Sequence, residues 1–148
     1  MKKMLVGLCL FFNTNLIYSQ DNAEDIINAF FDTYQKNTDK ALDDIYATNV
    51  WGSEMKDALT GMKKTVRGYS DEMGKYYGFE FITKQKCTER FLLFAYMLRY
   101  DRQPMQVLFA FYKPNDKWIL YSLNFNSHFD EDLETAAQYY IIQNPDNK

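Results

Sequence analysis

The side chains that could carry acid–base or metal chemistry are few and scattered. His128 is the single histidine, and it precedes three consecutive acidic residues, 130–132. A zinc site needs paired ligands that one histidine does not supply, whereas carboxylates in the first turn of a helix complement its dipole. The segment therefore predicts an acidic helix start with a solvated or capping histidine. A histidine at the rim of a cavity and a loose calcium site are the alternatives, and no metal site is assigned.

The other reactive groups also have structural explanations. Cys87 has neither a histidine nor the start of a helix near it in the sequence to activate its thiol, so it is expected to be a small residue in a strand. Arg90, Arg99 and Arg102 could bind a carboxylate or a phosphate, but adjacent acidic residues offer them ion pairs first. The sequence contains no GxGxxG, Walker loop, GxSxG or CxxC motif, so no cofactor is predicted.

Aromatic side chains form the most suggestive pattern, with 12 tyrosines and 12 phenylalanines in the chain. A buried phenol needs a partner for its hydroxyl, and aromatic walls with few polar groups are typical of pockets for small, mostly apolar ligands. Ordinary core packing is the competing explanation. The predicted ligand-binding residues are Tyr34, Trp51, Tyr69, Tyr96, Phe109 and Tyr121.

Three helices are predicted before residue 78. Apolar residues recur at helical spacing after the capping residues 21 and 22, and polar residues 36–39 end this first helix and cap the second. Residues 48–52 predict a corner or a very short strand, and Ser53 then caps a third helix with an apolar stripe that runs to Tyr76. The apolar positions of the first helix are Ala23, Ile26, Ile27, Phe30, Phe31 and Tyr34.

From residue 78 the apolar period becomes two, which indicates strands. Residues 79–87, 90–100, 105–113 and 117–125 predict four strands with short polar connections, which is typical of an antiparallel meander. We therefore expect an α+β fold in which helices pack on a curved, four-stranded antiparallel sheet. The positions expected to face the helices are Val107, Phe109, Phe111, Ile119, Tyr121, Leu123 and Phe125.

The opposite side of this sheet is also rich in apolar residues. Antiparallel sheets usually expose one face to water, and a contiguous exposed apolar patch commonly marks an interaction surface. We therefore expect a homodimer through the sheet. The competing expectation is that a C-terminal helix folds back over it. The weak apolar stripe of that helix comprises Leu133, Ala136, Ala137 and Tyr140.

The first 20 residues have the layout of a secretory signal peptide. They contain two lysines, an apolar run from Met4 to Phe12 and small residues near Ser19. The run is too short to span a membrane. Residues 21–148 are then expected to form a single domain that is exported to the periplasm or released. The formal net charge of −3 argues against nucleic acid and anionic membranes as partners.

The order of elements resembles the nuclear-transport-factor-2-like, or cystatin-like, α+β roll. The segments that carry the resemblance are FFDTYQKNTDKALDDIYATNVW, residues 30–51, and the last strand KWILYSLNFN, residues 117–126. The resemblance implies a sheet that curls around a cavity closed by helices. Enzymes of that superfamily, such as ketosteroid isomerases, place an aspartate base and tyrosine or acid donors inside the cone, where this chain has mainly apolar residues.

We expect a non-enzymatic binding or interaction domain for a small apolar ligand or a protein partner. The alternative is a small, cofactor-free enzyme of the isomerase or hydrolase type, with Asp32, Asp44 or Glu80 as its acid or base. An enzyme should bury such a carboxylate beside tyrosine donors. A third possibility is that side chains fill the interior and leave the sheet face as the only functional surface.

Overall fold

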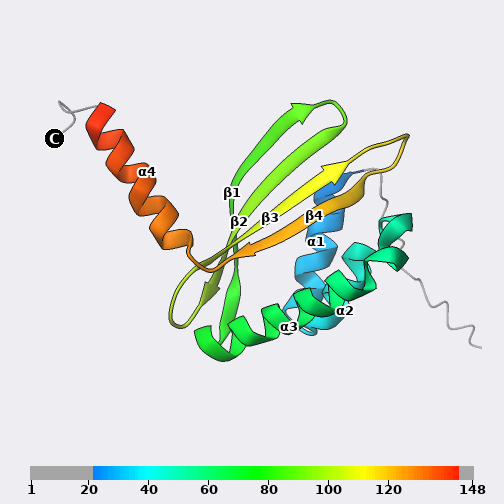
Figure 1. Cartoon of the computed structure of the whole chain (residues 1–148), viewed down its shortest axis with the longest axis horizontal. Coiled ribbons are helices and arrows are strands. Elements are labelled where there is room, and N and C mark those ends of the chain that lie inside the picture. The colour runs from blue at the N-terminus through cyan, green and yellow to red at the C-terminus, as the bar shows by residue number, and fades with distance from the viewer. Residues whose placement is uncertain (1–21, 144–148) are drawn as a thin grey trace, which may run out of the picture.

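The computed structural model describes residues 22–143 and confirms the α+β class. Three helices pack against one face of a curved, four-stranded antiparallel sheet that does not close into a barrel (Figure 1). A fourth helix follows the sheet. The predicted signal peptide lies outside the described residues.

The first two helices form where the apolar periodicity predicts them. In α1 (Ala23–Tyr34) the side chain of Asn22 accepts a hydrogen bond from the backbone N–H of Glu24, and all six predicted apolar positions are buried. Asn37 caps α2 (Thr38–Tyr46) in the same way. An Asn side chain at this position satisfies a backbone N–H that the helix leaves without a partner.

The third helix differs from the prediction at both ends. A 3₁₀ helix, η1 (Val50–Met55), takes the place of the predicted corner or strand and leads directly into α3 (Lys56–Met73). Ser53 therefore lies within η1 and does not cap α3. Tyr76 does not continue the apolar stripe of α3, because the helix ends before it and Tyr76 begins the first strand.

The stop after α3 depends on Gly74. Its φ of 84° lies in the left-handed region, which glycine adopts without strain. A Cβ atom there would lie 2.7 Å from the Oδ2 atom of Asp101. That oxygen accepts a hydrogen bond of 2.7 Å from the Lys75 N–H, and Arg102 donates one of 2.6 Å to the carbonyl of Glu72. The turn at residues 101–104 thus fixes where the helix ends and the sheet begins.

The sheet is the predicted meander, with strand order β1-β2-β3-β4. We call the end that contains the β2–β3 turn the near end, and the end that contains the β1–β2 and β3–β4 turns the far end. β1 is a long edge strand whose register shifts three times, after residues 76, 81 and 86. The strands are β1 (Tyr76–Thr88), β2 (Phe91–Tyr100), β3 (Met105–Tyr112) and β4 (Ile119–Asn126).

The core lies between the concave face of the sheet and the helices. Val107, Phe109 and Phe111 of β3 are fully buried, and β2 contributes alternate residues from Leu92 to Tyr100. The side chain of Asn49 donates a 3.0 Å hydrogen bond to the Leu120 carbonyl. This bond joins the loop after α2 to the edge strand β4.

The predicted face of β4 is wrong at its beginning. A β-bulge shifts the register between Ala110 and Phe111, so that Phe111 pairs with Leu120, and Tyr121 is the extra residue. Two residues opposite one reverse the alternation. Leu120 is therefore buried, whereas Tyr121 is 60% exposed. Trp118, which strict alternation places on the other face, is buried as well.

The C-terminal helix α4 (Phe129–Gln143) does not fold back over the sheet. It starts at the near end, where its first residue, Phe129, is buried and the Asn126 side chain donates a 2.7 Å hydrogen bond to Asp132. It then leads away on the side opposite the other three helices (Figure 1). Leu133 and Tyr139 are 52% and 64% exposed.

Candidate interaction surface

The structure brings three of the six predicted ligand-binding residues together in the core. Tyr34, Tyr96 and Phe109 are buried around the rings of Phe30 and Phe31. Ring centroids are 5.3 Å apart for Phe30–Phe109 and for Phe30–Tyr34, and 5.1 Å for Phe31–Tyr96. These are edge-to-face or tilted contacts of packed aromatic rings. These residues therefore pack against one another in the core.

The polar end of this cluster is satisfied internally. The hydroxyls of Tyr34 and Tyr100 are 2.9 Å apart in a buried hydrogen bond. Burial raises the pKa of the Tyr34 phenol far above its usual value, and the adjacent Tyr100 phenol adds to the increase. Burial also raises the pKa values of Tyr76 and Tyr100. These three phenols are therefore neutral at physiological pH.

The other three predicted ligand-binding residues lie elsewhere. Tyr69 of α3 is half-buried at the border of the core. Trp51 is 64% exposed in η1, and Tyr121 is exposed on the opposite face of the sheet, beside Phe91 at a ring distance of 5.5 Å. The structure therefore does not assemble the six residues into one site.

The carboxylates proposed for an enzyme do not point into the core. Asp32 is exposed, the Asp44 side chain is paired with Lys40 at 2.6 Å, and that of Glu80 lies 3.4 Å from the Arg99 guanidinium. Within residues 22–143, no Asp, Glu, Lys, Arg or His side chain is buried. The same part of the chain holds no group of three or more His, Cys, Asp or Glu side chains suited to a metal ion.

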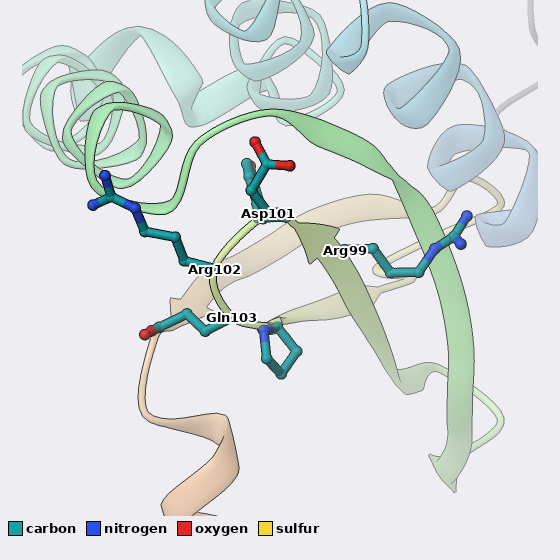
Figure 2. A pocket seen from close by; sticks show the side chains of 6 residues that line it. Arg99, Asp101, Arg102 and Gln103 are labelled. Atoms are coloured by element: carbon teal, nitrogen blue, oxygen red, sulfur yellow. The ribbon is translucent and has the colours of Figure 1, made fainter.

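A depression of about 350 Å³ lies at the β2–β3 turn. Its charged side chains point in different directions: Asp101 towards the α3–β1 connection, Arg102 towards the end of α3, and Arg99 across β1 (Figure 2). Each is used by the fold, since the Tyr77 hydroxyl donates to Asp101 at 2.6 Å and Arg99 donates to the Tyr77 carbonyl at 3.2 Å. The depression is therefore a by-product of the turn, with no charges that converge on a ligand.

The face of the sheet opposite α1, α2 and α3, which we call the outer face, is different. Three successive rows of paired residues cross all four strands on this face. The first row consists of Thr83, Ala95, Leu108 and Asn124, and none of these side chains is charged. Along the strands, this face carries charge only towards the near end, in the Glu80–Arg99 pair. The other two rows are Gln85, Leu93, Ala110 and Ser122, and then Thr88, Phe91, Tyr112 and Ile119.

Large apolar side chains of the outer face remain open to solvent. Leu93 and Leu108 are 36% and 37% exposed in the central strands, and Tyr112 and Tyr121 are 41% and 60% exposed at the far end. A quarter of the chain's residues are charged, so three uncharged rows are unusual for a solvated face. The apolar alternation of β2 already indicated this surface, whereas the position of Tyr121 on it depends on the bulge.

The comparisons with known proteins leave the chain without an assigned relative: no family model, no curated protein and no solved structure matches it. Among residues 22–143, no helix is long and apolar enough to cross a membrane. The candidate site therefore depends on the geometry of the outer face alone.

Proposed function

We propose that the protein is an exported, non-enzymatic interaction domain, and that two copies of the chain associate through the outer face. The observation that carries this proposal is the uncharged, partly apolar surface of three rows across four strands. Large apolar patches on the surface of a protein commonly mark interaction sites. A protein partner fits this surface better than a small apolar ligand fits the interior, because aromatic rings already occupy the core around Phe109.

A second copy of the chain is the partner that the chemistry of this face suits. In a two-fold symmetric contact the same patch occurs on both subunits, so a charge close to the symmetry axis approaches its own copy. An uncharged patch avoids this repulsion. The strand β3 has eight residues, so the face is about 27 Å long and about 19 Å wide. Its projected area of about 500 Å² is of the order of the ~800 Å² per partner in a standard interface.

The first test is the effect of a buried charge on the oligomeric state. We expect the unaltered protein to be a dimer in sedimentation velocity between about 1 and 100 µM, and Leu108→Glu to raise the dimer Kd at least about tenfold, since an unpaired charge would be buried between the faces. Leu108→Thr, which keeps a strand-forming side chain and adds no charge, should weaken the dimer less.

Val50→Glu is the matched control. Val50 is 82% exposed in η1. The variant therefore replaces an exposed apolar residue with the same negative charge, but at a position away from the sheet, and it should leave the dimer intact. Circular dichroism would establish that each variant is folded. An unaltered protein that stays monomeric throughout this range would overturn the proposal, and so would equal effects of the Leu108 and Val50 variants.

A further inference from the structure

The two ends of the outer face differ in charge. At the far end, Lys86 and Glu89 form an ion pair of 2.6 Å, and basic residues outnumber acidic ones among the remaining charges, with Arg90, Lys113 and Lys117 against Asp116. Backbone and side-chain bonds hold these turns together: the Lys113 N–H donates to the Arg90 carbonyl at 2.9 Å, and the Arg90 guanidinium donates to the Lys113 carbonyl at 3.1 Å. The basic groups are therefore presented by one ordered unit.

The helix that starts at the near end is acidic. Within α4 there are four carboxylates and no lysine or arginine. Those at residues 130–132 complement the helix dipole, but Glu134 lies beyond the first turn and the dipole does not account for it. The whole helix extends on the side of the sheet where the outer face lies (Figure 1).

Beyond the buried Phe129, the side chains of residues 130–139 in this helix are exposed. An isolated helix of 15 residues is marginally stable in water, because most helical stability in proteins comes from burying one side against other elements. Leu133 and Tyr139 remain more than half exposed. A partner placed against the outer face would stand beside α4 and could supply that contact.

We infer that the two copies pair with their strands antiparallel across the interface, so that the first two turns of each α4 lie against the far-end turns of the other copy. Two-fold pairing of two faces allows either opposite ends or like ends to meet. The antiparallel arrangement places the acidic turns of α4 beside Lys117 of the partner copy. The arrangement with like ends together would place α4 beside α4, acid against acid, and basic turns against basic turns. Charge complementarity of this kind fixes orientation and suppresses wrong pairings.

This inference depends on the proposed dimer, and charge reversal in the full chain tests it separately. We expect Glu131→Lys/Glu134→Lys to raise the dimer Kd about tenfold at low salt, and Lys117→Glu to raise it as well. Combining all three substitutions in one chain restores opposite charges across the interface, so the Kd should return to within about threefold of the unaltered value. Salt should diminish every one of these effects.

The control for net charge is Asp71→Lys/Glu72→Lys, which makes the same change at two exposed positions near the end of α3. It should leave the Kd unchanged. A dimer that tolerates both reversals, or that the combined variant fails to restore, would overturn the orientation and leave the dimer standing. A monomeric unaltered protein would overturn both proposals.

Cross-linking gives a second reading that does not depend on affinity. In a Cys9→Ser/Cys87→Ser background, a mixture of Glu134→Cys and Lys117→Cys chains should form heterodimeric cross-links with a short bifunctional maleimide. Glu134→Cys alone should not cross-link to itself. The reverse result, self-linked Glu134→Cys and no mixed product, would show that like ends meet and would contradict the inference.

Discussion

At the scale of single residues, the hydroxyl pair of Tyr34 and Tyr100 links the first helix to the end of the second strand. These residues are 66 positions apart in the sequence, and each hydroxyl satisfies the other inside the aromatic core. Leaving one buried hydroxyl with fewer partners costs free energy. The pair therefore explains why two phenols occur in a core that could have held two phenylalanines.

The raised pKa values of Tyr34, Tyr76 and Tyr100 predict how stability depends on pH. In the unfolded chain these phenols ionise near pH 10, whereas the folded state keeps them neutral to higher pH. Their contribution to the free energy of unfolding is therefore complete below about pH 10 and is lost as the pH rises above it. Urea unfolding at a series of pH values from about 8 to 11 should show this decline.

Tyr34→Phe should lower the free energy of unfolding by about 1 kcal/mol at neutral pH. Above pH 10 it should reduce the slope of the decline, because one ionising phenol is absent from the unfolded state. The double variant Tyr34→Phe/Tyr100→Phe serves as the check, since coupled residues should cost less together than the sum of the two single changes. An unchanged alkaline slope in Tyr34→Phe would contradict this assignment.

At the scale of elements, the bulge in β4 decides which side chains belong to which face. Strict alternation would bury Ile119 and Tyr121, but the extra residue turns Leu120 and Trp118 inward. The same shift moves Tyr121 to the outer face, where its ring meets Phe91 at an edge-to-face angle. One inserted residue therefore adds an aromatic side chain to the candidate interaction surface.

The bulge predicts opposite sensitivities for two neighbouring residues. Leu120→Ala should lower the free energy of unfolding by about 2–5 kcal/mol, because it opens a cavity in the core. Tyr121→Ala should lower it by less than about 1 kcal/mol in dilute, monomeric protein. Thermal or urea unfolding of both variants at the same low concentration is the measurement. The reverse order of sensitivities would show that β4 alternates without a bulge.

At the scale of the whole molecule, one face of the sheet is committed to the core and the other is open. The concave face and three helices bury the aromatic cluster, whereas the outer face and α4 keep apolar side chains in solvent. These open surfaces lie on the same side of the sheet (Figure 1). The proposed dimer would bury both of them in one contact.

Hydrogen exchange should detect this shared contact. Local stability depends on buried contacts. Amide exchange in α4 should therefore be fast in dilute protein and at least about tenfold slower at protein concentrations at which the dimer is populated. The Leu108→Glu variant should keep fast exchange in α4 at both concentrations, while exchange in the core strand β3 stays slow. Slow exchange of α4 in this variant would mean that its own chain already stabilises the helix.

The sequence alone determined most of the local structure. The apolar spacing of α1 and α2, their asparagine caps and the change to a period of two after residue 78 all correspond to elements in the structure. These features depend on neighbours within a few positions, so a sequence pattern records them directly. The excess of apolar residues in β2 also indicated a second apolar face, which the structure leaves exposed.

Only the tertiary structure decided how these elements share their surfaces. Whether the aromatic residues line a cavity or fill it depends on how closely α1 approaches the sheet, and Phe30 and Phe31 reach Phe109 directly. The bulge at Tyr121 and the direction of α4 likewise follow from the balance of packing on both faces of the sheet. That balance depends on contacts between residues far apart in the sequence, and a local pattern contains no record of them.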